Sequence, residues 1–261
     1  MQSRTTLAAA SQEQAPAQGR TLSLTLDDPR VSLCLPTGEG QVTLTQLVAP
    51  ARTICDQLVA AIRHQAGQHD RPITCRKGCS ACCRYLVPLS VPEALLLPTE
   101  MAARTPPRTR LKLLASARKL LDAGPPPNLH SLDPTQAPQA LSGWYTRANV
   151  TCPFLSNSCC RIYAQRPLAC REHLAQSTRQ ACASHSLDRG SLVTPRLSVS
   201  TALADLTAEL EGRPPEAVML PLALPWCHEN ATRNQTLYPA DQAIHRLIQL
   251  LQAQARHPAT A

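Results

Sequence analysis

Two short stretches of the sequence contain cysteines at spacings that suit a metal site. We call residues 75–83 the first motif and residues 152–182 the second motif. In order, their cysteines are Cys75, Cys79, Cys82, Cys83, Cys152, Cys159, Cys160, Cys170 and Cys182. Spacings of two and three residues in a tight loop let successive sulfur atoms converge on one ion. We therefore interpret most of these thiols as ligands of zinc or iron.

Disulfide bonds and buried free thiols explain these cysteines less well. A chain of 261 residues is long enough to bury a core without disulfides. The N-terminal sequence lacks the apolar run of a secretory signal, so we expect a reducing, cytoplasmic location. Buried cysteines occur singly on apolar faces, as we expect for Cys34, Cys55 and Cys227. Cys159 is expected not to bind metal, because the side chains of adjacent residues diverge.

Basic side chains accompany the thiols, and we expect them to lower the thiol pKa values. They are Arg76, Lys77, Arg84, Arg161, Arg166 and Arg171. Pro167 is expected to open a short helix whose N-terminal field favours a thiolate at Cys170. His173 and His185 each follow a cysteine by three positions. Either could bind the metal, but we favour a place at the surface or behind the ligands.

The two motifs together resemble a known family. The pattern "GCSACC…VPLSVPEA", then "CPFL", then "CRIYAQRPLACREH", is similar to the YkgJ-type cysteine-cluster family, described as zinc- or iron-chelating. The resemblance covers about residues 75–185 and is specific, because two separate motifs agree in order and residue type. It implies that the metal ligands are Cys75, Cys79, Cys82, Cys83, Cys152, Cys160 and Cys170, and that Cys182 has a counterpart in the closest relatives. Cys159 is an extra thiol in this pattern.

The residues leave the metal and the biochemical role open. Seven or eight thiols fit two Zn²⁺ sites or one [4Fe–4S] cluster with spare thiols. The first interpretation is a metal-stabilised accessory or binding protein. The alternative is an iron–sulfur enzyme or electron carrier, because the first motif has the cysteine spacing of radical S-adenosylmethionine enzymes and flagellin lysine methylases resemble this family. Two observations argue against a radical S-adenosylmethionine enzyme. Ala81 precedes the third cysteine, where those enzymes usually have an aromatic residue, and the sequence shows no succession of strand–helix units.

The charge gives little support to a nucleic-acid partner. The formal net charge is +8, but thiolates at a metal site would offset part of it. The dense basic run from Arg104 to Lys119 is expected to be a solvated face. The predicted partner is therefore a metal ion, with a protein partner left open. No apolar run is long enough to span a bilayer.

The elements that must position the motifs are mostly helices. We expect a mainly α fold with a few short N-terminal strands, in which one helical domain over 21–261 follows a disordered leader, residues 1–20. Helices are predicted over about 44–66, 91–98, 108–122, 200–211 and 240–256, with a Pro-rich connector at 124–140. In the helix at 108–122, the apolar face is predicted to be Leu111, Leu114, Ala117 and Leu121. Glu93 and Glu172 are interpreted as helix-start charges rather than catalytic acids.

Overall fold

The computed structural model describes residues 20–256, except for 28–29, 38–39, 70, 127–132, 134–135, 177, 184–191 and 194. The predicted disordered leader therefore lies outside the described residues, apart from Arg20, which begins the first strand. None of the described helices is long and apolar enough to cross a membrane.

Helices dominate the fold, as predicted. They are α1 (Val48–Gln68), α2 (Val91–Arg104), α3 (Pro107–Asp122), α4 (Ala137–Ala148), α5 (Leu168–Glu172), α6 (Arg179–Ala183), α7 (Val199–Glu211), α8 (Ala223–Asn230) and α9 (Ala240–Arg256). The strands of the described residues form antiparallel pairs: β1 (Arg20–Asp27) with β2 (Arg30–Thr37), β3 (Gln41–Val42) with β10 (Tyr238–Pro239), β4 (Pro88–Ser90) with β9 (Ala217–Met219), β5 (Leu155–Ser156) with β6 (Cys159–Cys160), and β7 (Leu174–Ala175) with β8 (Leu192–Val193).

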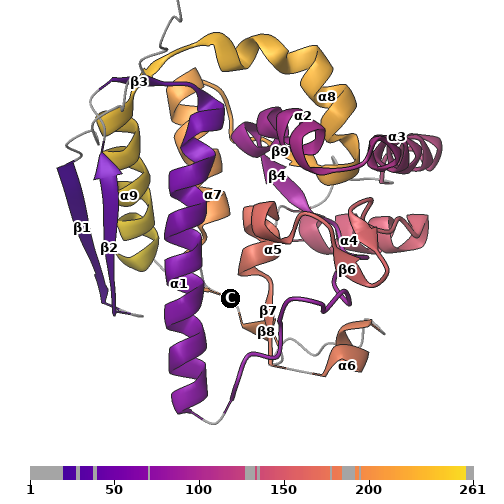
Figure 1. Cartoon of the computed structure of the whole chain (residues 1–261), viewed down its shortest axis with the longest axis horizontal. Coiled ribbons are helices and arrows are strands. Elements are labelled where there is room, and N and C mark those ends of the chain that lie inside the picture. The colour runs from indigo at the N-terminus through magenta and orange to yellow at the C-terminus, as the bar shows by residue number, and fades with distance from the viewer. Residues whose placement is uncertain are drawn as a thin grey trace, which may run out of the picture.

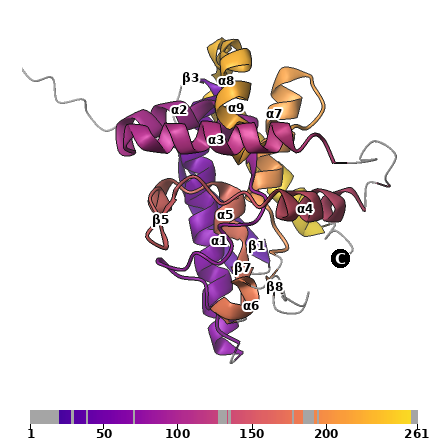
Figure 2. The same cartoon turned by 90° about the vertical axis from the view of Figure 1, so that its right-hand side faces the viewer.

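The helices form two groups, with the short helix α5 between them (Figure 1). In the first group α1, α7 and α9 pack together, and the β1–β2 hairpin lies against α1 and α9. The second group contains α2, α3, α4 and α8, and α3 runs alongside α4 (Figure 2). Because α5 contacts both α1 and α7 and carries Cys170, the second cysteine motif meets the helical scaffold there.

The first group encloses an aliphatic core. Leu203, Leu206 and Leu247 are fully buried within it. The helix predicted over 44–66 is present as a single 3-10 turn, Leu44–Leu47, followed by α1, with Pro50 in the first turn of α1. Proline is tolerated there because the first N–H groups of a helix have no intrahelical partner. Nearly all of this core is built from Leu, Ile, Val and Ala, as the scarcity of aromatic residues requires.

Helix α2 begins as predicted but ends later. Glu93 accepts hydrogen bonds from the N–H and the hydroxyl of Ser90, which forms the predicted cap at the helix start. The predicted end at Pro98 is wrong, because the helix continues to Arg104. Proline removes one backbone hydrogen bond. Burial of Leu97 and Met101 on either side of Pro98 holds the helix together despite that loss.

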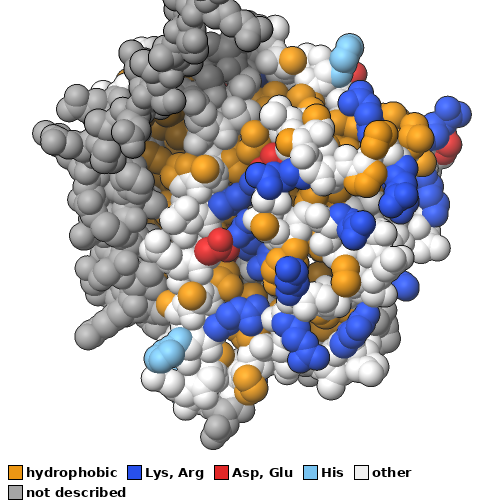
Figure 3. All heavy atoms as spheres, in the orientation of Figure 1, with side chains coloured by type: hydrophobic (Ala, Val, Ile, Leu, Met, Phe, Trp, Pro, Cys, Tyr) orange, Lys and Arg blue, Asp and Glu red, His pale blue; other side chains and the backbone are white. Residues whose placement is uncertain are grey.

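Helix α3 buries Ala117 as predicted, but the leucines that it turns toward the core are not the predicted ones. Leu111 and Leu121 are 68% and 63% exposed, whereas Leu113 and Leu120 are buried. Leucines on two overlapping stripes give the helix two possible apolar faces, so spacing alone could not select the one that packs against Leu220–Leu222. The basic side chains of the run are exposed: Arg104, Arg108, Arg110, Lys112, Arg118 and Lys119. Figure 3 shows Lys and Arg side chains gathered on the half of this face that carries α3 and the cysteine loops.

The predicted connector is shorter than 124–140. Helix α4 begins at Ala137, so the last four residues of the predicted connector are helical. Much of the remainder, 127–132 and 134–135, lies outside the described residues. The assignment of residues 21–261 to one domain stays a prediction.

Candidate metal centre

Backbone hydrogen bonds join the two cysteine motifs directly. The N–H of Cys152 donates to the carbonyl oxygen of Cys83 at 2.7 Å, so the end of the first motif lies against the start of the second. The N–H of Thr74 donates to the carbonyl oxygen of Ala175 at 2.9 Å, next to Cys75. The expected approach of these two distant stretches is therefore present in the fold.

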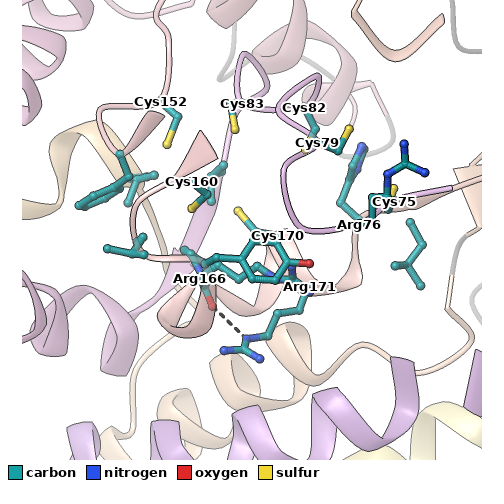
Figure 4. Close-up of a pocket in the computed structure, with 18 of the residues that line it drawn as sticks. Cys75, Arg76, Cys79, Cys82, Cys83, Cys152, Cys160, Arg166, Cys170 and Arg171 are labelled. Carbon is teal, nitrogen blue, oxygen red and sulfur yellow. Dashed lines mark hydrogen bonds between the residues drawn. The ribbon is translucent and has the colours of Figure 1, made fainter. Parts of the chain in front are cut away.

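Cysteines from both motifs line one pocket of about 80 Å³ (Figure 4). They are Cys75, Cys79, Cys82, Cys83, Cys152, Cys160 and Cys170. In Figure 4 the sulfur atoms of Cys83, Cys152, Cys160 and Cys170 surround one end of the pocket, while Cys75 lies toward the other. Seven of the eight predicted ligands thus line one pocket.

The remaining cysteines are placed as follows. Cys182 does not line the pocket but is buried with Ala81 and Ala175 in a small cluster against which Cys75 and Cys79 pack. Cys159 is exposed and does not line the pocket, and Cys55 is buried in α1 as predicted. Cys227 is half-buried in α8, and Cys34 lies on β2. Apart from Cys34, whose side chain is not described, the described cysteines form no disulfide bond.

The thiols lie close to one another, but they are not arranged as the ligands of a bound metal ion. Among the described residues, no group of three His, Cys, Asp or Glu side chains is spaced to hold a metal ion as it stands. The thiol of Cys83 is instead hydrogen-bonded with those of Cys82 and Cys152. Each such bond needs a proton on at least one of its two sulfur atoms, so ligation of a metal requires loss of protons.

The environment of the pocket raises the pKa values of five of its thiols, contrary to the sequence-based expectation: Cys75, Cys82, Cys83, Cys160 and Cys170. A hydrogen bond with Cys152, then burial, raises the pKa of Cys83 to about 12, although the bond with Cys82 lowers it. Burial, followed by charge repulsion from Cys82 and Cys160, raises the pKa of Cys170. Arg166 lowers the pKa of Cys160, but burial outweighs it. The basic neighbours and the N-terminal field of α5 therefore do not produce free thiolates.

Helix α5, which carries Cys170, is fixed at its N-terminal end by a buried carboxylate. Glu93 is 3% exposed and accepts the N–H of Leu168 at 2.8 Å, in addition to its bonds with Ser90. The prediction of a helix-start charge is confirmed for α2, and the same carboxylate also holds the start of α5. Pro167 stands just before Leu168, as expected for a residue that opens a helix.

Two further charged residues fix the other side of α5. Arg171 is 5% exposed and donates to Asp56 of α1 and to the carbonyl oxygens of Arg166 and Ala164. Glu172 accepts the N–H groups of Val199 and Ser200, so it caps the start of α7 rather than that of its own helix. The charged residues around Cys170 in the motif thus act as anchors.

His173 lies in the wall of the pocket, immediately after α5. Its Nε2 atom is buried and has no hydrogen-bond partner. The ring meets that of Tyr85 edge to face, with centroids 5.4 Å apart. The surface position is therefore wrong for His173, since the side chain lines the pocket, and the place behind the ligands stays a prediction. His185 lies outside the described residues.

The donor set fits a thiophilic metal. Among the described residues, the pocket wall offers seven sulfur atoms and one imidazole but no Asp or Glu side chain. Thiolate and imidazole ligands suit zinc and iron–sulfur clusters, whereas Ca²⁺ and Mg²⁺ require oxygen ligands. The N–H of Ala175 donates to the sulfur of Cys75 at 3.3 Å, the kind of contact that supports a metal-bound thiolate.

Comparison with known proteins identifies the same region. Residues 74–187 match the family model "CxxCxxCC: Putative zinc- or iron-chelating domain". All eight predicted ligands lie within this match. No curated protein and no solved structure matches the chain. The resemblance predicted from the motifs is confirmed by this match, which covers residues 74–187.

Proposed function

We propose that this chain holds zinc or iron with thiolates from both motifs and that the metal fastens the motifs together. The proposed ligands are drawn from Cys75, Cys79, Cys82, Cys83, Cys152, Cys160 and Cys170, with Cys182 beside them. The observation that supports this function is a single pocket lined by seven thiols from both motifs and by no carboxylate.

The raised thiol pKa values favour a cation in this pocket. Protonated thiols can pack together in a buried space, but thiolates in the same space repel one another. Such repulsion from Cys82 and Cys160 contributes to the raised pKa of Cys170, after burial. A bound Zn²⁺ or iron–sulfur cluster supplies the positive charge that stabilises thiolates. Cysteines on separate loops would then be joined through one centre.

The corresponding role is that of a metal-stabilised accessory or binding protein. The free thiols of the described residues must remain reduced to bind metal, so we place the protein in the cytoplasm. The Cys152–Cys83 backbone hydrogen bond already brings the motifs together, and the metal would add the contact between their side chains.

The number of thiols favours a second candidate function. Four thiolates complete either one tetrahedral Zn²⁺ site or one [4Fe–4S] cluster, and seven line this pocket. An iron–sulfur protein that carries electrons or catalyses a reaction at the cluster would use the same residues. Visible absorption of iron–sulfur charge transfer in anaerobically purified protein would support this candidate, and a colourless zinc-loaded protein would exclude it.

Elemental analysis of protein purified without oxygen tests the proposal. We expect at least one zinc or iron per chain. Cys159 and Cys160 provide a matched pair, since they are adjacent in β6 but only Cys160 lines the pocket. Cys160→Ser should lower the metal content or weaken its retention against a chelator, whereas Cys159→Ser should behave as the wild type. A wild-type protein that carries no metal and takes up neither Zn²⁺ nor Fe²⁺ under reducing conditions would overturn the proposal.

A further inference from the structure

The imidazole of His173 has a buried nitrogen that the fold leaves unsatisfied. His173 follows Cys170 by three residues and lines the cysteine pocket. Its Nε2 atom is buried and lacks a hydrogen-bond partner. A buried polar atom without a partner typically costs about 1–3 kcal/mol, so native proteins rarely leave one without a reason. An occupant of the pocket that bonded to Nε2 would remove this cost.

Comparison with the other unsatisfied atoms separates His173 from them. Among the described residues, four buried side-chain nitrogens lack partners: Arg52 Nε, Trp144 Nε1, Arg166 Nε and His173 Nε2. The arginine and tryptophan nitrogens carry a hydrogen and have no lone pair to offer. An imidazole nitrogen can instead present a lone pair when the ring is neutral. His173 is thus the one of these four that can serve as a metal ligand.

The surroundings of His173 keep the ring neutral and restrict its orientation. Burial lowers the pKa of His173. The edge-to-face contact with Tyr85 fixes one side of the ring, and the phenol hydroxyl of Tyr85 donates to the carbonyl oxygen of Cys182. The backbone N–H of His173 donates to Ala169 at the end of α5. The ring is therefore held between the helix that carries Cys170 and the segment that carries Cys182.

We propose that Nε2 of His173 is a ligand of the metal, which makes the centre a mixed sulfur–nitrogen site. This inference rests on the proposed metal-binding function and adds a ligand that the cysteine pattern does not contain. Replacing one of four thiolates by a neutral imidazole changes the formal charge of a Zn²⁺ site from −2 to −1. A less negative centre costs less free energy to bury.

X-ray absorption at the edge of the metal carried by the purified protein tests this ligand assignment. Metal–nitrogen bonds of about 2.0–2.1 Å are distinguishable from metal–sulfur bonds of about 2.3 Å in zinc sites. We expect the wild-type protein to show both, with imidazole scattering. His173→Phe and His173→Gln should lose the nitrogen contribution and retain metal at least about tenfold less tightly. His245→Gln, which changes an exposed histidine on α9, should leave the spectrum and the affinity unchanged.

The outcomes separate this inference from the proposed function. A metal-loaded wild type with an all-sulfur shell would overturn the role of His173 and leave the metal-binding function intact. If folded His173→Phe or His173→Gln protein still shows the metal–nitrogen contribution, the ligand is another histidine. This result would also overturn the inference. Failure of the wild type to bind any metal would overturn the proposed function itself. Should neither variant fold, the wild-type spectrum still shows whether any nitrogen is bound, and an all-sulfur shell decides against His173.

Discussion

The α1–α7–α9 core and the cysteine pocket are stabilised in opposite ways. The core consists of aliphatic side chains, such as Leu203, Leu206 and Leu247, that need no partner beyond one another. The pocket wall instead combines seven thiols with an imidazole nitrogen that has no partner. One region is complete when the chain has folded, whereas the other has the donor groups of a site that an ion would complete. With the proposed function, folding and metal binding would be linked mainly through the second region.

Metal removal gives the sharpest test of this comparison. Structural Zn²⁺ contributes on the order of 10 kcal/mol to folding in small peptides, so chelation under reducing conditions should lower the melting temperature strongly. Hydrogen exchange should show protection lost first around Cys152–Cys170 and last in α7 and α9. An unchanged melting curve after complete removal of the metal would contradict the linkage.

The pH dependence of metal affinity should be steep. Because the pKa values of Cys82, Cys83 and Cys170 are raised, these thiols hold their protons at neutral pH and must release them on ligation. Affinity should therefore rise with pH by about tenfold per pH unit for each thiol that loses a proton. Competition with a zinc indicator between pH 6 and pH 8, together with calorimetry in buffers of different ionisation enthalpy, measures the number of protons released. An affinity that is flat across this range would mean that the ligating thiols are already ionised.

A cavity in the aliphatic core should act on folding without acting on the metal. Leu206→Ala removes a fully buried side chain from α7 and should lower the free energy of unfolding by about 2–5 kcal/mol. Metal content per folded chain should remain that of the wild type. Leu237→Ala is the control, because Leu237 is 52% exposed. Denaturant unfolding and elemental analysis of both variants measure the effect, and loss of metal from folded Leu206→Ala protein would show that the two regions are not separable.

Glu93 tests the junction between the two regions. Glu93→Ala removes the acceptor of the Leu168 N–H and of the Ser90 groups, which should cost about 1–3 kcal/mol. Metal should also be held less tightly, since α5 positions Cys170. Glu93→Gln keeps one acceptor oxygen and should recover part of both losses, while Glu229→Ala, at an exposed position on α8, serves as the control. Unfolding curves and chelator competition give the two readouts, and full metal affinity in Glu93→Ala would show that α5 does not depend on this carboxylate.

The sequence predicts those features whose determinants are local. The helix predicted over 240–256 is observed with the same bounds, because the spacing of its apolar side chains defines it. The predicted cap formed by Ser90 and Glu93 is also present, because it depends on local hydrogen bonds. The cysteine motifs also identify seven residues of one pocket, since their spacing is a property of the loops themselves. The family match over 74–187 agrees with the motifs.

The features that the sequence does not predict depend on contacts between distant residues. The buried face of α3 is selected by Leu220–Leu222, about a hundred positions later, so the leucine spacing within the helix could not identify it. The thiol pKa values rise because burial exceeds the influence of Arg166, and burial is a result of the whole fold. Glu172 resembles a cap for its own helix in the sequence, but it bonds to the start of α7. The unsatisfied Nε2 of His173 is visible only when its surroundings are known.

The anchoring of α5 by Glu93, Arg171 and Glu172 has a consequence for signalling within the molecule. A five-residue helix tied to α2, α1 and α7 has little freedom to shift by itself. Any displacement of Cys170 when an ion enters or leaves must therefore be transmitted to these three long helices. Binding or loss of the ion would in this way be coupled to the packing of α1, α2 and α7.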